Sequence, residues 1–587
     1  MQTKVLPKIK ALQRWLAGPV ENVRLSLRGI SKRIKSPGLA MKLFGTTQPF
    51  IESRESSFKI GRLVANYDFF KALFKYSDFD EFHIFCPNYA NCKLTEKRIS
   101  EEDIPSDRKA KIKVFHIASL KKSIIENNYH IFHLGGWGFF FPGLIHLRNI
   151  YSPKPFPITG ITHSLNAKQA SFHALKVCTA PTMPFDSIVC TSNCGKKVLE
   201  SLFEATENNF KQMNIKYRGR MDVIPLGIDD TCRTIPNRLE SRKSLGIDAD
   251  SFVILSLGRL TSVDKMDFAP FLACLRRFTE KNKARKIVLI LAGRADNHEQ
   301  RLIRSLLQEK QLEEITKLFI NFGSNKKSVF YSAADVYTAP VDNFQETFGL
   351  SVVEAMAHEC AVVISDFNGY SEIVDHGING IKIPTFWGDV TKEFEDVSEI
   401  MNFSTYQLLL SQSVAVDVDK MSEALQELLD KREKRDLLGK AAREKVERNY
   451  FWSDIIKQYC TLWNELSEQA QCSSVEARKP KNPWEIDYRS VFSHYSSKIV
   501  SADSMICLSE YGKEVLKSGD IPVSYSDVGA SVIIPKLVAA ALKVIAPKLI
   551  TTAQFIDSLQ KYAAISDSTA LYYLLWMAKY NMVRISD

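Results

Sequence analysis

Short apolar runs alternate with stretches of helical spacing along most of the chain. In the first half, strand-like runs occupy residues 81–87, 111–117, 130–136, 157–163, 187–192 and 221–229. In the second half they occupy residues 251–260, 286–294, 317–323, 335–340 and 360–366. Strands that alternate with helical patterns predict parallel sheets covered by helices. The pattern therefore predicts an α/β protein.

The two sets of strands predict two Rossmann-like doubly wound domains in succession, with a hinge near residues 230–246. In open parallel sheets, ligands bind beyond the carboxyl ends of the strands. When two such domains face each other, the cleft between them is the expected ligand site. A charged helical stretch follows from Met421.

The composition changes again after Glu476, where about 110 residues remain and begin with a linker-like KPKNPW. Residues 549–585 have the order helix, turn, apolar helix and short strand, which predicts a small winged-helix-like module. Its second helix is apolar, and Lys579 and Arg584 are its only nearby cations. A nucleic-acid reader would be more basic, so docking of a protein partner or simple packing is the expected role.

These patterns divide the chain into five parts. The predicted parts are an N-terminal arm (1–47), a first Rossmann-like domain (48–235), a second Rossmann-like domain (236–450), a crossover helix region (451–476) and a C-terminal appended module (477–587).

The net charge of +11 is concentrated at the N-terminus. Residues 1–45 contain ten Lys and Arg and one acid, Glu21, interleaved with Leu, Ile and Trp15. Such a segment is typical of a helix that lies on an anionic membrane, and equally of a solvated basic extension. No uninterrupted apolar core follows it, as a secretory signal would require.

Neither membrane spanning nor metal binding is expected. The most apolar stretch, residues 528–550, is interrupted by three lysines and two prolines. The eleven cysteines are odd in number and scattered, without the paired spacing of a zinc site. Reduced thiols in a cytoplasmic protein, either fully cytoplasmic or peripheral at the inner membrane face, are the expectation.

Two carboxylates lie in an otherwise apolar segment, ETFGLSVVEAMAHECAVVISD. Glu346 precedes a predicted helix, and Glu354 lies about one turn inside it. The N–H groups of Phe348, Gly349 and Leu350 open this helix and would face an anion. Carboxylates accept hydroxyl donors well, so sugar or ribose diols suit them. The alternative is a pair of ordinary helix-dipole and helix-surface carboxylates.

Two cations follow the first strand of the second domain, in GRLTSVDK. Arg259 and Lys265 lie at the carboxyl edge of the predicted sheet. Fixed cations near a helix start suit a diphosphate. Two solvated surface cations are the alternative.

Four segments, in this order and spacing, resemble the family-four retaining glycosyltransferases of the GT-B fold. They are VIPLGID (223–229), GRLTSVDK, ETFGLSVVE with its E-x7-E pattern, and GYSEIVDHGINGIKIP (369–384), in which Glu372, Gly377 and Gly380 match. The resemblance covers roughly residues 61–466.

The resemblance implies a metal-independent hexosyltransferase of glycan biosynthesis that uses a nucleotide-diphosphate sugar as donor and needs no cofactor. The first domain would bind the acceptor, a glycan or lipid-linked glycan, and the second the nucleotide sugar. The implied catalytic residues are Glu346, His163, Arg259 and Lys265. The implied donor-binding residues are Arg259, Lys265, Phe348, Gly349, Leu350 and Glu354.

The first domain matches the family less closely. ITHSL places His163 where the family often has a histidine near the donor sugar, and TSNCGKK places Ser192 and Lys196 at a serine and cation of the family. The family's glycine-rich loop after the first strand is represented only by its end, from Gly61. Met266 stands where glycine usually follows the clamp lysine.

The segment HLGGWGFFFPG (133–143) has glycines that admit a ligand close to the backbone and aromatics that can stack on sugars. A buried apolar turn is its alternative. For the whole protein, a nucleotide-sugar epimerase of the same fold and an inactive transferase that acts as a scaffold through its C-terminal module remain alternatives.

Overall fold

The computed structural model describes residues 41–47, 61–390, 392–473, 482–522 and 533–586. Nearly all of the predicted basic arm lies outside these residues. So does the segment 48–60, where the family's glycine-rich loop would begin.

The first domain is built on a seven-stranded parallel sheet with the order β3-β2-β1-β4-β5-β6-β7. Its strands are β1 Leu43–Thr46, β2 Glu81–Cys86, β3 Ile112–His116, β4 Ile131–Leu134, β5 Ile158–Ile161, β6 Ser187–Cys190 and β7 Arg220–Val223. Its helices are α3 Gly61–Tyr76, α4 Tyr89–Glu101, α5 Ser106–Lys109, α6 Leu120–Glu126, α7 Phe141–Tyr151, α8 Ala170–Thr179 and α9 Asn193–Asn209. The six strands predicted here are all present.

The central strand β1 was assigned to the arm by the sequence, and this assignment was wrong. β1 pairs with β2 on one side and β4 on the other, and Phe44 is fully buried. A strand covered on both faces shows no apolar–polar alternation, and this one is only four residues long. The first domain therefore begins before residue 48.

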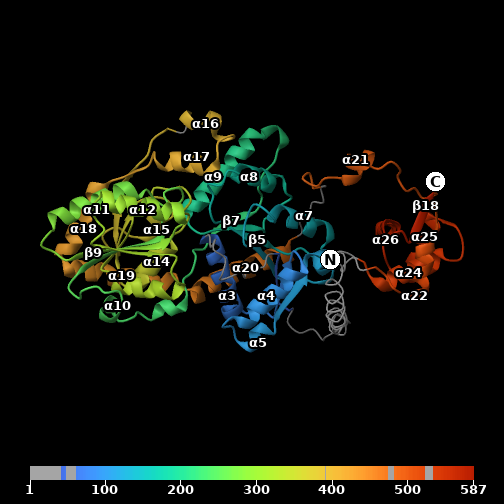
Figure 1. Ribbon diagram of the computed structural model, residues 1–587, viewed down its shortest axis with the longest axis horizontal. Coiled ribbons are helices and arrows are strands. Elements are labelled where there is room, and N and C mark those ends of the chain that lie inside the picture. Colours follow the sequence, from blue (N-terminus) through green and yellow to red (C-terminus); the bar gives the residue numbers. More distant parts are fainter. Residues whose placement is uncertain (1–40, 48–60, 391, 474–481, 523–532, 587) are drawn as a thin grey trace, which may run out of the picture. The chain divides into compact units, whose positions relative to one another are not determined.

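The second domain contains a six-stranded parallel sheet with the order β10-β9-β8-β11-β12-β13. Its strands are β8 Phe252–Arg259, β9 Ile287–Arg294, β10 Thr316–Ile320, β11 Val336–Ala339, β12 Ala361–Ser365 and β13 Ile381–Ile383. Its helices are α10 Arg238–Ser244, α11 Phe268–Lys281, α12 Asn297–Glu309, α13 Lys327–Ala333, α14 Leu350–Ala357, α15 Tyr370–Ile373, α18 Val418–Asp430 and α19 Arg432–Asn449. Helices cover both faces of this sheet, for example α11 and α12 on one side and α14 and α19 on the other (Figure 1).

Both sheets confirm the predicted architecture of two doubly wound domains. In each, the order reverses beside the first strand of the domain, between β1 and β4 and between β8 and β11. Loops at the carboxyl ends of the strands on either side of such a reversal diverge, which leaves room for a ligand. The end of β8 and the loop after it carry the two predicted cations, Arg259 and Lys265, and the loop after β11 and helix α14 carry the two predicted glutamates.

A small excursion interrupts the second domain between β13 and α18. It consists of β14 Thr385–Phe386, α16 Lys392–Ser398, α17 Phe403–Ser411 and β15 Ala415–Val416, and β14 pairs antiparallel with β15. Gln407 of α17 accepts a hydrogen bond from Asn166, and Lys168 donates to the carbonyl of Glu399. The excursion therefore contacts the loop that follows β5 of the first domain.

Helix α20 Trp452–Cys472 returns the chain to the first domain, in the segment predicted to cross over. The Trp463 ring lies 5.5 Å from Phe44, and its indole N–H donates to the hydroxyl of Thr159 at 3.2 Å. At the crossing point the N–H of Ile228 donates to the carbonyl of Tyr450 at 2.8 Å. The two segments of chain that connect the domains are thus joined by backbone hydrogen bonding.

The C-terminal part forms a separate apolar core around an antiparallel sheet with the order β17-β16-β18. Its elements are α21 Tyr488–Phe492, β16 Met505–Leu508, α22 Glu510–Ser518, α24 Pro535–Ile545, β17 Ile550–Thr551, α25 Thr552–Tyr562, α26 Asp567–Lys579 and β18 Val583–Ser586. The predicted order of helix, turn, apolar helix and strand is that of α25, α26 and β18. The apolar side chains of helix α26 belong to this core, in which Leu574 and Met577 are fully buried. The winged-helix assignment itself stays a prediction.

Candidate functional site

Lys265 is a buried cation at the carboxyl edge of the second sheet. Its side chain is only 9% exposed, and its ammonium donates to Tyr370 Oη at 2.6 Å and to Glu346 Oε2 at 3.1 Å. Burial and the charge of Glu346 hold the pKa of Tyr370 well above its ordinary value, so the phenol is protonated. The predicted cation and the predicted first glutamate are therefore in direct contact.

Arg259, the other predicted clamp residue, is held by a different carboxylate. It forms an ion pair with Asp264, and its Nη2 donates to the Asp264 carbonyl at 3.0 Å. Burial raises the pKa of Asp264, and Arg259 opposes that rise. Arg259 therefore has a fixed orientation at the end of β8, without contact with Glu346.

Asn343 joins the loops that follow three strands of the second sheet. Its side-chain amide donates to the carbonyl of Val263 at 2.6 Å, and its Oδ1 accepts the N–H of Gln345 at 2.7 Å. Its carbonyl accepts a hydrogen bond from the side chain of Asn368 at 3.1 Å. The loops after β8, β11 and β12 are thereby fixed relative to one another.

The N-terminal end of α14 directly follows Glu346, as predicted. Within the described part of the chain, no protein group accepts a hydrogen bond from the N–H of Phe348, Gly349 or Leu350. A Cβ at Gly349 would lie 2.6 Å from the Tyr370 ring, so only glycine allows this close approach. Unpaired N–H groups and Lys265 together form an electropositive environment suited to an anion.

Glu354 lies inside α14 and already has protein partners. Lys327 Nζ donates to both carboxylate oxygens, at 2.8 and 3.0 Å, and Tyr331 Oη donates to Oε2 at 2.8 Å. Burial lowers the pKa of Lys327, but the charge of Glu354 more than offsets this and leaves the pKa raised. Three of the roughly four acceptor positions of a carboxylate are thus in use.

Asp68 of α3 brings a further carboxylate from the first domain to this pair. Burial raises its pKa to about 7, an effect that Lys327 reduces and that Asp229 and Glu354 reinforce. The ammonium of Lys327 is therefore shared electrostatically by acids of both domains.

His163 lies at the end of β5, where the first domain meets the loop before α14. The hydroxyl of Thr347 donates to the His163 carbonyl at 2.9 Å, and Ser192 Oγ donates to the Thr347 carbonyl at 2.7 Å. The His163 ring nitrogen Nε2 lies 3.0 Å from Oδ1 of Asn66, whose amide donates to the carbonyl of Gly135. His163 and Ser192 thus both contact the segment that contains Glu346.

Lys196 and Glu372 make contacts of another kind than the predicted clamp residues Arg259 and Lys265. Lys196 pairs with Glu200 at 4.0 Å, one turn along the surface of α9. Glu372 of α15 accepts the N–H and the side-chain amide of Asn193, at 2.9 and 3.0 Å, and also the N–H of Cys194. A carboxylate from the second domain therefore caps the N-terminus of α9 in the first.

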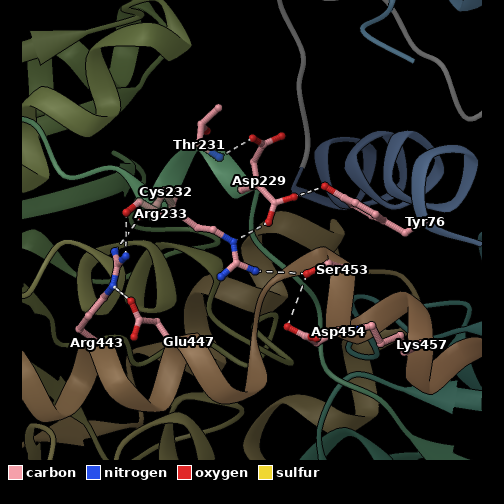
Figure 2. Close-up of polar contacts among 11 residues, drawn as sticks. Tyr76, Asp229, Thr231, Cys232, Arg233, Arg443, Glu447, Ser453, Asp454 and Lys457 are labelled. Carbon is pink, nitrogen blue, oxygen red and sulfur yellow. Dashed lines mark hydrogen bonds and ion pairs between the residues drawn. The ribbon is translucent and has the colours of Figure 1, made fainter. Parts of the chain in front are cut away.

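The interdomain turn Asp230–Arg233 is tied to both domains (Figure 2). The hydroxyl of Tyr76 of α3 donates to Asp230, and the Arg233 guanidinium reaches the hydroxyl of Ser453 at 3.2 Å. Arg443 donates to the carbonyls of Cys232 and Arg233, both at 2.8 Å, and to that of Ala357 at the end of α14. Arg443 therefore links the hinge to the helix that carries Glu354.

Sequence reasoning missed Tyr370, Lys327, Tyr331 and Asp68 as site residues. Tyr370 belongs to residues 369–384, one of the four segments that resemble the family. The sequence therefore did contain an indication that Tyr370 lies near the site. No sequence pattern indicated Lys327 or Tyr331, because they reach Glu354 from another helix, 27 and 23 positions away along the chain.

The comparison with protein families gives one match. Residues 237–402 match the model of the family described as "Glycosyl transferases group 1". The match covers most of the second sheet domain, from α10 to the excursion.

Curated relatives match about a third of the chain. A D-inositol 3-phosphate glycosyltransferase of Pseudarthrobacter chlorophenolicus is 25% identical over 164 residues, 28% of this chain and 38% of that protein. An uncharacterized glycosyltransferase of Methanocaldococcus jannaschii is 28% identical over 200 residues, 33% of this chain and 46% of that protein. The chain thus spans less than half the length of these relatives.

Among solved structures, the Anabaena protein HepE in complex with UDP has a TM-score of 0.49 at 16% identity, covering 72% of this chain and all of HepE. Sucrose-phosphate synthase from Thermosynechococcus elongatus has a TM-score of 0.46 at 18% identity, covering 72% of this chain and 99% of that one. Within the described residues, no helix has the length and apolar character needed to cross a bilayer.

Proposed function

Starting from the group 1 glycosyltransferase domain formed by residues 237–402, we propose that this protein transfers a sugar from a nucleotide-diphosphate donor to an acceptor, with retention of anomeric configuration. The observation that carries the proposal is the position of Lys265. Its ammonium contacts Glu346 and lies beside the unpaired N–H groups at the start of α14.

In this proposal the charge that builds on the departing diphosphate is stabilised by fixed positive groups. Lys265, Arg259 and the N–H groups of Phe348, Gly349 and Leu350 are the candidates. Groups that are already oriented stabilise developing charge without reorganisation at the moment of reaction. No metal ion is needed for this role, since the cations and N–H dipoles supply the compensating charge.

Glu346 is proposed to contact the donor sugar, while Lys265 keeps its carboxylate oriented. In the front-face reaction expected from the family resemblance, the acceptor hydroxyl forms the new glycosidic bond on the face from which the phosphate departs. The acceptor proton passes to the departing phosphate. No protein base is required for that step.

Glu354 is proposed to bind the ribose. One acceptor position of its carboxylate remains available, and the two that Lys327 occupies become available if Lys327 turns toward Asp68. Donor binding would then redistribute the charge of Lys327 between the two domains.

The acceptor side is proposed to include His163 and Asn66, which lie at the edge of the first sheet beside Thr347. The contacts of Thr347 with Ser192 and with His163 bring the first domain against the donor loop. Water excluded by these contacts cannot compete with the acceptor, which favours transfer over hydrolysis.

The test begins with a panel of nucleotide sugars and thermal denaturation, because a ligand that binds only the folded state raises its apparent stability. The stabilising donor is then used to compare Lys265→Met with Lys286→Met. Lys286 is an exposed residue of the same domain that pairs with Asp248 and Asp250. We expect kcat to fall by about 10²-fold or more in Lys265→Met and to stay unchanged in Lys286→Met.

Equal turnover by both variants would contradict the proposed site. Conversion of the donor sugar without any acceptor would favour the epimerase. Absence of stabilisation and of turnover with every nucleotide sugar would favour the scaffold.

A further inference from the structure

Helix α7 of the first domain has an apolar outer stripe. Phe140, Gly143, Leu147 and Ile150 follow one another at helical spacing on one side. Phe140 is 45% exposed and Ile150 is 40% exposed, while Leu147 is half-buried. No charged side chain interrupts this stripe.

The inner side of the same helix holds apolar side chains together with its polar ones, His146, Arg148 and Asn149, which are buried as well. Phe141 and Ile145 are fully buried, and Leu144 is 4% exposed. A surface helix normally turns its polar side to solvent, whereas α7 buries Arg148 and Asn149 and exposes apolar side chains. The outer stripe of α7 is therefore suited to an apolar environment outside the domain.

Exposed aromatic rings extend the stripe toward α8, which packs beside α7 (Figure 1). Phe139 is 66% exposed with its ring 5.1 Å from that of Phe140, and Phe172 of α8 is 48% exposed. Trp484 lies 5.3 Å from Phe172, and its indole N–H donates to the hydroxyl of Thr179. These rings form one continuous aromatic region.

The charged residues that residues 127–185 contribute have a single sign. Residues 127–185 contain no Asp or Glu, but they contain Lys154, Lys168 and Lys176. Lys176 lies 5.8 Å from the centre of the Phe172 ring. On the other flank, Lys121 of α6 lies 4.1 Å from the centre of the Tyr151 ring. Within residues 127–185, apolar rings are thus accompanied by lysines and not by carboxylates; acids occur only at the border, at Glu126 of α6 and at Glu485 and Asp487 after Trp484.

We infer that this surface docks the protein on an anionic lipid membrane. We define it as the α7 face: Phe139, Phe140, Leu147, Ile150 and Phe172, with Lys154 and Lys176. Rings and aliphatic side chains enter the headgroup boundary, while lysines remain at the level of the lipid phosphates. A protein interface would generally carry rim charges of both signs to fix its register, whereas the charged residues of the α7 face itself are lysines.

The α7 face is connected to the candidate site through the loop that precedes α7. The side-chain amide of Asn66 donates to the carbonyl of Gly135 in this loop, and Asn66 also contacts His163. Docking would therefore present a membrane-linked acceptor to the first domain. This last consequence rests on the proposed function, but docking itself does not.

The experiment is co-sedimentation of the full chain with vesicles of phosphatidylcholine, with and without phosphatidylglycerol. The apolar variant is Phe139→Ser/Phe140→Ser/Ile150→Ser, and the charge variant is Lys154→Gln/Lys176→Gln. The matched control is Leu239→Ser/Leu437→Ser, two side chains of the second domain that are 60% and 66% exposed.

We expect the partition coefficient on anionic vesicles to fall by about tenfold or more in the apolar variant and about tenfold in the charge variant. The control variant should bind as the wild type does. Wild-type binding in the apolar variant, or no binding of the wild type to either vesicle, would overturn the inference.

Hydroxyl-radical footprinting separates this face from every other part of the chain that could bind lipid. Vesicles should reduce modification of Phe139, Phe140 and Tyr151 but not of Tyr562, which is 68% exposed in the C-terminal module. Bound protein with unchanged modification of the α7 face would show that another segment binds. Self-association that is lost in the apolar variant, without lipid binding, would assign the face to a second copy of the chain. Nucleotide-sugar stabilisation is measured apart from lipid, so failure of docking and failure of the proposed function are distinguishable.

Discussion

The Lys265 ammonium lies 3.1 Å from the Glu346 carboxylate, although 81 positions separate the two residues. The contact joins the loop after β8 to the loop after β11, on either side of the point where the order of the second sheet reverses. The lysine predicted to bind the diphosphate and the glutamate predicted to contact the sugar therefore belong to one hydrogen-bonded group. Tyr370 completes this group by accepting a second hydrogen bond from the same ammonium.

Replacement of Tyr370 by Phe removes one acceptor from Lys265 and leaves the ring packed against Gly349. Loss of a hydrogen bond to a charged group costs about 1.5–3 kcal/mol, so we expect kcat to fall about tenfold or more with a small change in donor KM. Steady-state kinetics with the stabilising donor measure both. Tyr562→Phe, in the C-terminal module, is the control. An unchanged kcat in Tyr370→Phe would show that Lys265 is positioned by Glu346 alone.

Replacement of Glu354 by Gln tests the ribose contact. We expect nucleoside diphosphate affinity to fall about tenfold or more, since one acceptor of a charged hydrogen bond is lost. The loss should vanish for a 2′,3′-dideoxy nucleoside diphosphate, which has no hydroxyl for Glu354 to bind. Calorimetric titration of both proteins with both ligands forms the cycle that measures the coupling. Equal losses for both ligands would assign Glu354 to the structural contact with Lys327 and Tyr331.

Arg443→Met should destabilise the second domain. The change leaves the carbonyls of Cys232, Arg233 and Ala357 without this donor, at a cost of about 3 kcal/mol or more. We expect a lower Tm and a higher donor KM, because α14 and the hinge lose their common anchor. Arg448→Met, at an exposed position of the same helix that pairs with Glu444, should leave both unchanged. Arg443→Lys should recover part of the stability but not the full donor affinity.

The buried carboxyl group of Asp342 should make part of the free energy of unfolding depend on pH. It is 5% exposed, and burial raises its pKa from 3.8 to about 7. The folded state thus holds the proton more tightly than the unfolded state, and the contribution present at low pH is lost as pH rises from about 4 to 7. If the whole pKa difference between the folded and unfolded states is converted, it corresponds to about 4 kcal/mol of unfolding free energy. Thermal unfolding should show Asp342→Asn gaining Tm relative to the wild type across this window and reaching a plateau above it.

A constant Tm difference between the two proteins from pH 4 to 8 would show that Asp342 does not titrate between these values. The N–H of Asp267 donates to the Asp342 carboxylate at 3.1 Å, and an asparagine oxygen can accept the same bond. The substitution therefore changes the charge with little change in packing.

The periodicity of the chain predicted most of the sheet strands, because helices and strands impose their own spacing on apolar residues. Strand β1 escaped detection because it is short, buried on both faces and adjacent to a basic segment. Its place between β2 and β4 is set by long-range pairing, which leaves no local pattern. The same reason explains why Asp68 and Lys327 were not foreseen beside Glu354.

The sequence by itself determined the two parallel-sheet domains and the edge of the second sheet at which Arg259, Lys265, Glu346 and Glu354 would lie. The strands and the positions of the motifs at their ends follow from local spacing and from the rule that parallel strands end at a common edge. Only the tertiary structure decided the partners: Glu346 with Lys265, Arg259 with Asp264, and Glu354 with Lys327 and Tyr331. Charges pair within a few ångströms, and which loops approach that closely depends on the packing of the whole domain.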